Sequence, residues 1–102
     1  MVAIVYSEIA IRDLKAIYNY IAKDSKHYAK TEVKLIREFV RKLKSNMWIG
    51  KNFERLDESV REMVFKNYRI IYEIISPIQI VILSIHHHAR SISNNPAFSN
   101  ED

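Results

Sequence analysis

The sequence predicts an α+β fold: an N-terminal strand, an α-helical hairpin packed on one face of a mainly antiparallel sheet, and a C-terminal β-meander. Three observations support this. Residues 60–90 are rich in β-branched and aromatic residues, interrupted only by the turn-like pairs Lys66-Asn67 and Ser76-Pro77. Two stretches between residues 8 and 44 repeat apolar side chains at helical spacing. A short apolar run over residues 1–6, typical of a buried strand, precedes them.

The two helical stretches carry their own start signals. Ser7 is placed as the N-cap of the first helix, and Asp24-Ser25 breaks the pattern and can cap the second. Because each helix has one apolar side, the hairpin must bury that side against the predicted strands. The apolar positions of the two helices are Ala10, Leu14, Ile17, Ile21, Ala29, Val33, Ile36, Val40 and Leu43.

The segment after the second helix contains Trp48 and Gly50, the only glycine of the chain. A single glycine predicts a backbone position with positive φ, in a turn that leads into a strand over residues 53–56. We expect Trp48 to lie as a lid over the edge of the core rather than to act as a binding platform.

The turn at Lys66-Asn67 defines the register of the first hairpin of the meander, with Asn67 tolerant of the left-handed conformation. Alternation then assigns each side chain to one of two faces. The predicted pairs on one face are Phe65 with Tyr68, Met63 with Ile70 and Arg61 with Tyr72, and the other face carries Val60, Glu62, Val64, Arg69, Ile71 and Glu73.

The third strand of the meander, residues 78–85, is apolar on both faces, which places it inside the sheet or beneath a partner. The Ser76-Pro77 turn leaves its register open. One helical hairpin covers one face of a sheet, so the other face, partly apolar, is predicted to be a partner-binding surface.

Length and composition indicate a single domain over residues 1–90, followed by a polar tail over residues 91–102 that we expect to be disordered. The lack of cysteine excludes disulfides and thiolate metal sites and fits a reducing cytoplasm. No apolar run reaches the roughly 18 residues of a membrane span, and the N-terminus lacks the pattern of a signal peptide. We therefore expect a cytoplasmic protein without a membrane partner.

Positive charge is concentrated in residues 26–51, which hold eight Lys or Arg against two Glu, in a chain of net charge +4. One interpretation is a solvated helix face. The other is a patch for nucleic acid or for an acidic protein, with Lys34, Arg37 and Arg41 as contact residues.

The residues that could take part in catalysis or bind a metal are His86-His87-His88 and Arg90, at the predicted end of the last strand. Alternation puts His86 and His88 on one face and His87 on the other, near Arg69, Arg61 and Tyr68 in the predicted pairing. No third ligand lies nearby in the sequence, so no metal or other cofactor is expected. One histidine beside arginines could act as acid or base in RNA cleavage, and the alternative is a role in contacting a partner or solvent.

Motifs in the order of the chain resemble the RelE/ParE superfamily of bacterial type II toxins. The first helix carries Ser7-x-x-Ala10-x-x-Asp13-Leu14-x-x-Ile17-x-x-Tyr20-Ile21-Ala22. The strands carry Val60-Arg61-Glu62-Met63, Asn67-Tyr68-Arg69-Ile70-Ile71-Tyr72 and His87-x-x-Arg90. The resemblance covers residues 1–90, and the Val-Arg-Glu and His-x-x-Arg motifs lean towards the ParE branch.

The resemblance implies a small toxin that a cognate antitoxin neutralises by covering its active surface, with a homodimer or a toxin–antitoxin hetero-oligomer as the assembly. Toxins similar to ParE inhibit DNA gyrase and are not nucleases. Toxins similar to RelE act on the ribosome and cut mRNA without a metal, using basic residues of the central strands. Arg69 falls where those nucleases carry an essential arginine, but Val60, Glu62 and Val64 replace the two lysines of their preceding strand.

These expectations favour a gyrase inhibitor that resembles ParE. The alternative of a ribosome-dependent mRNA endoribonuclease has Arg69, His86, His88 and Glu62 as candidate catalytic residues, and a third reading is an inactive relative that only binds antitoxin. The partner-binding residues under the favoured reading are Arg61, Arg69, Tyr68, His87, Arg90, Lys34, Arg37 and Arg41.

Overall fold

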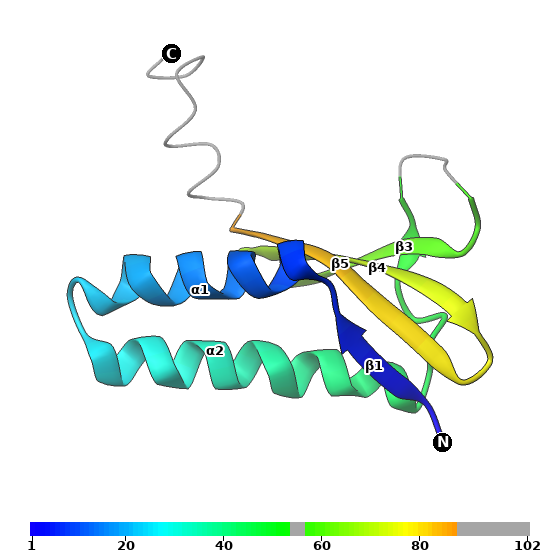
Figure 1. The fold of residues 1–102 in the computed structure, drawn as a ribbon, viewed down its shortest axis with the longest axis horizontal. Coiled ribbons are helices and arrows are strands. Elements are labelled where there is room, and N and C mark those ends of the chain that lie inside the picture. The colour runs from blue at the N-terminus through cyan, green and yellow to red at the C-terminus, as the bar shows by residue number, and fades with distance from the viewer. Residues whose placement is uncertain (54–56, 88–102) are drawn as a thin grey trace, which may run out of the picture.

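A five-stranded mixed sheet carries two antiparallel helices on one face (Figure 1). The computed structural model describes residues 1–53 and 57–87. The sheet order is β1-β5-β4-β3-β2, with β1 parallel to β5 and the other neighbours antiparallel. The elements are β1 (Ala3–Tyr6), α1 (Glu8–Ala22), α2 (Lys26–Val40), the 3-10 helix η1 (Arg41–Lys44), β2 (Lys51–Asn52), β3 (Val60–Phe65), β4 (Tyr68–Ser76) and β5 (Gln79–His87). The predicted α+β architecture is confirmed.

Both predicted helix caps are present. The Ser7 hydroxyl accepts a hydrogen bond from the Ala10 amide at 3.0 Å, and the Ser25 hydroxyl accepts one from the Tyr28 amide at 3.1 Å. Ser7 also donates to the Leu83 carbonyl at 2.9 Å, so the cap ties the start of α1 to β5. The same residue therefore begins the helix and anchors it to the sheet.

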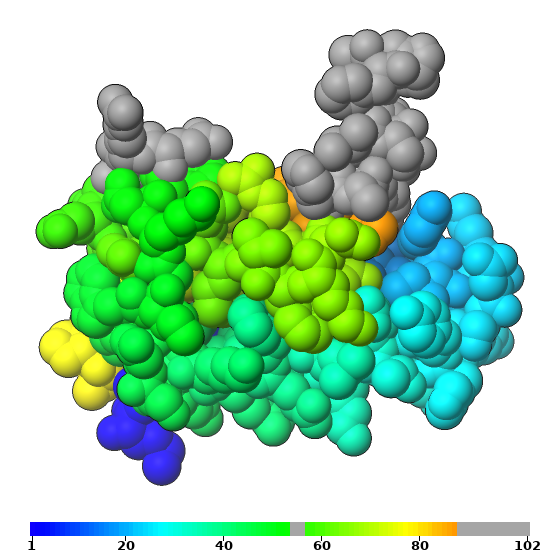
Figure 2. All heavy atoms as spheres, turned by 180° about the vertical axis from the view of Figure 1, so that it is seen from behind, coloured from blue at the N-terminus to red at the C-terminus, as the bar shows by residue number. Residues whose placement is uncertain are grey.

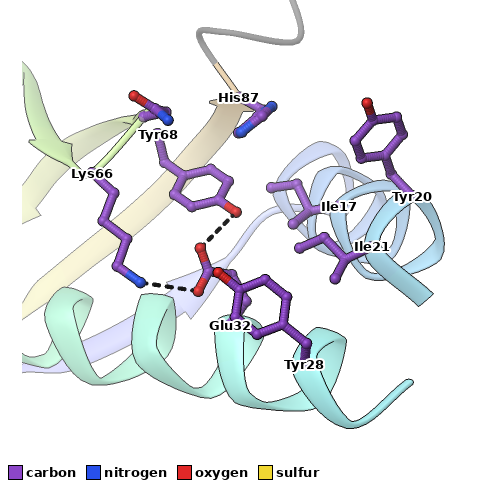
Figure 3. A pocket seen from close by; sticks show the side chains of 9 residues that line it. Ile17, Tyr20, Ile21, Tyr28, Glu32, Lys66, Tyr68 and His87 are labelled. Atoms are coloured by element: carbon purple, nitrogen blue, oxygen red, sulfur yellow. Dashed lines mark hydrogen bonds and ion pairs between the residues drawn. The ribbon is translucent and has the colours of Figure 1, made fainter. Parts of the chain in front are cut away.

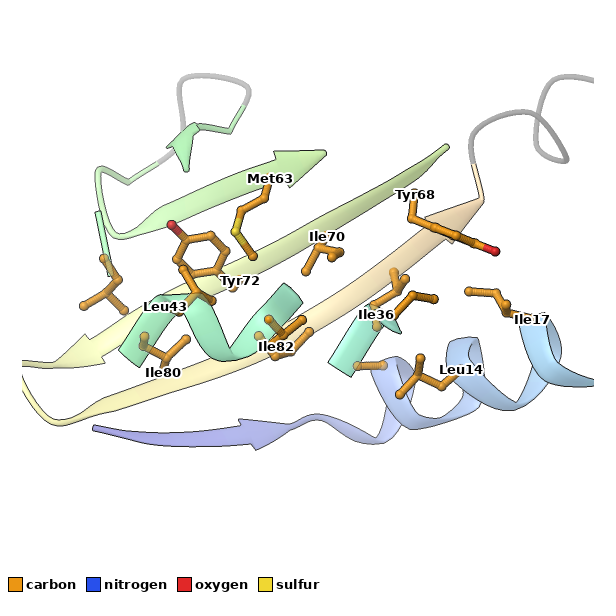
Figure 4. Close-up of a cluster of buried hydrophobic side chains, with 14 residues drawn as sticks. Leu14, Ile17, Ile36, Leu43, Met63, Tyr68, Ile70, Tyr72, Ile80 and Ile82 are labelled. Carbon is orange, nitrogen blue, oxygen red and sulfur yellow. The ribbon is translucent and has the colours of Figure 1, made fainter. Parts of the chain in front are cut away.

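The core lies between the helices and the sheet (Figure 4). Of the predicted helix positions, Ile21 and Val33 are only partly buried and the others are buried. The strands contribute from one face, and Tyr72 is the largest side chain that is fully enclosed. The strand residues of the core are Met63, Tyr68, Ile70, Tyr72, Ile74, Ile80, Ile82 and Ile85.

The predicted β3–β4 register is confirmed for all three pairs. The turn differs in one detail, because the positive φ of 55° falls on Lys66 rather than on Asn67. The register of β5, left open by the sequence, contains a shift between Ile71 and Tyr72, which pair with Ser84 and Ile82. This irregularity lets Ile82 and Ile85 both reach the core although they are three residues apart.

The prediction that Gly50 needs a positive φ is wrong, since no described glycine has one. Gly50 is instead required by close approach: a Cβ there would lie 2.6 Å from the Glu62 carbonyl oxygen and 2.7 Å from the Tyr72 hydroxyl. The predicted strand over residues 53–56 falls mostly outside the described residues. Strand β2 ends at Asn52 and Phe53 lies in a bend, while residues 54–56 are outside the described residues.

From behind, the side chains of α2 and η1 run beside the β3–β4 hairpin (Figure 2). The face of the sheet that the helices leave uncovered carries Val60, Glu62, Val64, Arg69, Ile71 and Glu73 from β3 and β4, as predicted, and Ile71 and Glu62 are buried there. No helix of the described residues packs on that second face, and none of their helices is long and apolar enough to cross a membrane.

Candidate functional site

Arg69, Glu62 and His86 meet on the face of the sheet that the helices leave uncovered. Arg69 lies opposite His86 on β5 and opposite Val64 on β3. Its guanidinium donates from Nε at 3.0 Å and from Nη2 at 2.8 Å to the same oxygen, Glu62 Oε1. The carboxylate is largely buried, so the charge of Arg69 is matched locally by an acid rather than left for an anionic substrate.

Lys51 is a further cation on this face, and it is not among the site residues predicted from the sequence. It lies opposite Glu62 in the β2–β3 pairing, while Val60 and Val64 hold the alternate positions of β3. The cluster thus offers one exposed imidazole, one paired arginine and one lysine at the sheet edge. Such a set could move a proton through His86, but its only described carboxylate already binds Arg69.

A cavity of about 240 Å³ lies on the other side of the sheet, where the ends of β4 and β5 meet the two helices (Figure 3). Glu32 of α2 is 5% exposed and forms its floor. Its two oxygens accept hydrogen bonds from Lys66 Nζ at 3.1 Å and from the Tyr68 hydroxyl at 3.0 Å. The rest of the lining is Ile17, Tyr20, Ile21, Tyr28, Asn67 and His87.

Burial, followed by the bond to Glu32, raises the pKa of the Tyr68 hydroxyl far above its ordinary value of 10.0. Tyr68 therefore stays protonated and acts as a hydrogen-bond donor, not as a base. The His87 ring packs against it with centroids 4.9 Å apart. Because Tyr68 is buried, a partner could reach it only through this cavity.

Arg61 lies apart from these two clusters, which corrects the prediction that it lies near the histidines. Its Nε donates to the Gly50 carbonyl at 2.7 Å, its Nη1 donates to the Glu58 carbonyl at 3.1 Å, and its guanidinium lies 5.0 Å from the Trp48 ring. Trp48 is half exposed and contacts this cation, so it is a less complete lid than expected. Arg61 holds the segment before β2 against β3.

The basic residues of α2 and η1 form a third surface. Lys34, Arg37 and Arg41 line a groove of about 330 Å³ together with Tyr18 of α1 and with Glu38, the one acid of its lining. The Arg37 guanidinium lies 5.0 Å from the ring of Tyr6, at the end of β1. In the part of the chain that is described, none of these three cations is in an ion pair, so their charge remains available.

The structure therefore distributes the other described site residues over three surfaces, with Arg61 apart from all of them. Glu62, Arg69 and His86 share the uncovered sheet face, Tyr68 and His87 share the cavity, and the cations of α2 and η1 share the groove. His88 and Arg90 lie outside the described residues. Within residues 1–53 and 57–87, no group of three or more His, Asp or Glu is placed to hold a metal ion.

Sequence reasoning missed Glu32 and Lys66. Glu32 is one of the two acids of the basic segment, yet its position between Ala29 and Ile36 lies on the apolar side of the helix. A charged residue on such a stripe signals a buried partner. Lys66, the residue with positive φ in the β3–β4 turn, supplies that partner.

Comparison with known proteins agrees with this architecture. The family model described as the ParE toxin of type II toxin–antitoxin systems, parDE, matches residues 4–92. A chain from a chromosomal ParDE system of P. aeruginosa has a TM-score of 0.72 and 25% identity, over 85% of this chain and 96% of that one. A chain of the RelBE2 toxin–antitoxin complex of Mycobacterium tuberculosis has a TM-score of 0.62 and 21% identity, over 84% and 96%.

No curated protein matches the chain. The likeness to the RelBE2 chain reflects the fold, whereas the family match extends over most of the sequence and includes the Tyr-Arg strand β4 and the Val-Arg-Glu strand β3. The chain belongs to the ParE toxin family of type II toxin–antitoxin systems.

Proposed function

We propose that this toxin arrests bacterial growth by inhibiting DNA gyrase, and that an antitoxin encoded beside it neutralises it in the cytoplasm. Membership of the ParE family supports the toxin class, and the name of the similar ParDE system supports an antitoxin partner. The gyrase target rests on a separate observation, which concerns Arg69.

Arg69 is bound to Glu62 through both Nε and Nη2. This pair is the observation that supports gyrase over mRNA as the target. Metal-independent RNA cleavage needs cations aimed at the phosphorane that forms when the 2′-hydroxyl attacks. Here the principal cation of the central strands is held by a carboxylate, and its β3 neighbour on the same face is Val64. A surface of this kind suits contact with a protein better than stabilisation of a dianionic transition state.

The second candidate is a ribosome-dependent mRNA endoribonuclease, and one observation favours it. His86 is exposed and lies directly opposite Arg69, so an acid or base and a cation are adjacent on the uncovered face. Under this alternative, RNA binding would have to draw Arg69 away from Glu62, and Lys51 would supply a second cation.

Induction of the toxin in a bacterium that lacks the antitoxin separates the two targets. Inhibition of gyrase predicts altered plasmid supercoiling and a DNA-damage response while mRNA 5′ ends remain unchanged. Endonucleolytic cuts mapped to the ribosomal A site, with normal supercoiling, would sink the gyrase proposal. An absence of any growth effect would instead support the third reading, an inactive relative that only binds antitoxin.

The variant His86→Asn gives a matched test in the same cells. Loss of a general acid or base typically costs 10²- to 10⁴-fold in rate, so a nuclease would lose its toxicity. The gyrase proposal predicts that the variant still arrests growth, because His86 has no role in it. Coexpression of the neighbouring open reading frame should restore growth in both strains.

A further inference from the structure

The cavity that Glu32 floors combines a carboxylate with a wall of aromatic rings (Figure 3). Glu32 is 5% exposed and Tyr68, which bonds to it, is 2% exposed, so this polar floor lies inside the protein. Tyr20 of α1, Tyr28 of α2 and His87 of β5 bring their rings to the same cavity from three elements. A buried carboxylate and the faces of aromatic rings both attract positive charge, so the lining favours a cation.

Two lysines of the chain already place their ammonium groups against this lining. Lys66 Nζ lies 3.1 Å from Glu32 Oε1, and Lys23 Nζ lies 5.8 Å from the centroid of the Tyr20 ring. The Lys66 side chain is 44% exposed and starts from the turn between β3 and β4, so it can swing into water without moving a strand. Its departure alone would leave the Glu32 carboxylate buried without a cation. A second ammonium group that takes its place would keep this charge matched.

The rest of the cavity suits the apolar part of a small molecule. Ile17 is buried and Ile21 is partly buried on the α1 side, whereas the rings of Tyr20 and Tyr28 are about half exposed and leave the cavity open to solvent. One water molecule needs about 10–15 Å³ of such space, so a volume of about 240 Å³ has room for a small organic molecule with an aromatic ring.

The floor of the cavity rejects anionic ligands. The Tyr68 hydroxyl donates its proton to Glu32 Oε2 and keeps it there, because burial and this bond raise the pKa of the hydroxyl far above its ordinary value of 10.0. It therefore offers no donor to a phosphate or a carboxylate, and Glu32 would repel either group. A neutral molecule meets no such repulsion, but it cannot replace the Lys66 ammonium on the carboxylate. A cationic ligand is thus the class that this floor selects.

We propose that this cavity binds a small organic cation, whose ammonium or guanidinium group replaces the Lys66 ammonium on Glu32 and whose apolar or aromatic stem lies beside Ile17 and the tyrosines. Lys66 then acts as an internal competitor that covers the carboxylate of the free chain. The ligand contacts α1, α2, β4 and β5 at once, so it joins the helical hairpin to the sheet. The cavity lies on the other side of the sheet from Glu62 and Arg69, so the proposal stands whether the toxin acts on gyrase or on mRNA.

NMR titration of the full chain at pH 7 tests the proposal, with benzylamine as the cation and benzyl alcohol as its neutral counterpart of the same shape. Benzylamine should shift the backbone signals of Lys66, Tyr68 and His87 in a saturable way. The alcohol should bind at least about tenfold more weakly, because it lacks the charge that pairs with Glu32. Equal affinity for the two molecules, or no saturable binding of benzylamine, would overturn the proposal. This comparison uses the wild-type chain, so it does not depend on the folding of any variant.

Substitutions at the floor should change the affinity for benzylamine in opposite directions. Lys66→Met removes the internal competitor and should tighten binding about tenfold, because the fraction of chains whose site is already occupied lowers the apparent affinity. Glu32→Gln keeps the shape of the side chain and should weaken binding about tenfold, since it removes the charge. Lys15→Met on α1 changes the net charge as Lys66→Met does but lies outside the lining, so it should leave the affinity unchanged. A purely structural ion pair predicts that both floor variants lose stability and that neither tightens binding, and this result would contradict the proposal.

Thermal unfolding gives an independent measurement. Benzylamine should raise the melting temperature of Lys66→Met by more than that of the wild type, because it supplies the cation that Glu32 then lacks. Equal rises in Lys66→Met and Lys15→Met would show binding that does not depend on the floor, and they would count against the proposal. Inorganic phosphate at the same concentration should leave the signals of Tyr68 and His87 unchanged. A saturable shift of these signals by phosphate would overturn the assignment of a cationic ligand.

Discussion

Replacing Arg69 by Met tests whether the pair with Glu62 exists and what it contributes. The pair is intermediate between two familiar cases, since the side chain of Glu62 is 10% exposed and that of Arg69 is 40% exposed. Exposed ion pairs contribute about 0–1 kcal/mol, and breaking a buried pair costs about 3–5 kcal/mol. We expect Arg69→Met to lower the free energy of unfolding by about 2 kcal/mol, because it leaves a nearly buried carboxylate without its cation.

A double-mutant cycle isolates the pair from other effects of the substitution. Glu62→Gln keeps an oxygen acceptor and should cost about 1 kcal/mol. The double variant should be less destabilised than the two single variants combined, with a coupling of about 1.5 kcal/mol. Lys34→Met is the control, because Lys34 is exposed and outside any ion pair in the described residues, so it should change stability by less than about 0.5 kcal/mol.

Urea denaturation at pH 7 measures the free energies of unfolding of the wild type and the four variants, and the melting temperature gives a second measurement. For a domain of this size, about 1 kcal/mol shifts the melting temperature by roughly 4–8 °C. A coupling below about 0.5 kcal/mol would refute the reasoning. Arg69 would then be free in solution, and the structural argument against RNA cleavage would lose its basis.

Four further predictions concern stability, measured by thermal or urea unfolding. Tyr68→Phe should cost about 1 kcal/mol at pH 7, because it leaves a buried oxygen of Glu32 without a donor. Because the pKa of Tyr68 is raised in the folded chain, its hydroxyl loses its proton at lower pH in the unfolded chain than in the folded one. Wild-type stability should therefore fall as pH rises above about 10. In Tyr68→Phe this fall should be smaller. Gly50→Ala should cost about 2–3 kcal/mol, since its Cβ would clash with Tyr72; a loss under 0.5 kcal/mol would contradict the packing. Ser7→Ala should cost about 2 kcal/mol through the lost cap and the lost bond to β5, whereas Ser7→Thr should retain most of it.

Local sequence patterns predict most of the fold. The two-residue turn at Lys66-Asn67 predicts the β3–β4 pairing, because strand side chains alternate with a period of two and a slip by one residue would turn Ile70 towards solvent. The serine caps were equally local, because each hydroxyl bonds an amide three residues away. The register of β5 was not local, because its shift beside Ile71 depends on contacts with β4 and α1.

The candidate sites depend on contacts between residues far apart in the sequence, which sequence periodicity does not predict. Glu32 is separated from Tyr68 by 36 residues and meets it only after the helical hairpin folds onto the sheet. The role of Gly50 depends on the approach of Tyr72, which is 22 residues away, so a turn-based reading of the glycine could not find it. Arg69 and Glu62, by contrast, are predicted from the sequence to lie on the same face of the sheet. The structure adds the side-chain geometry of their pair.

The proposal that this ParE-family chain inhibits gyrase and does not cleave RNA can be tested directly with purified components. The purified toxin should be titrated into gyrase-catalysed supercoiling of relaxed plasmid, and the same preparation into ribosomes that carry a defined message. We expect dose-dependent loss of supercoiling, reversed by the neighbouring gene product, with the message left intact. Cleavage of the message at the ribosomal A site, with supercoiling unaffected at equal toxin concentration, would contradict it.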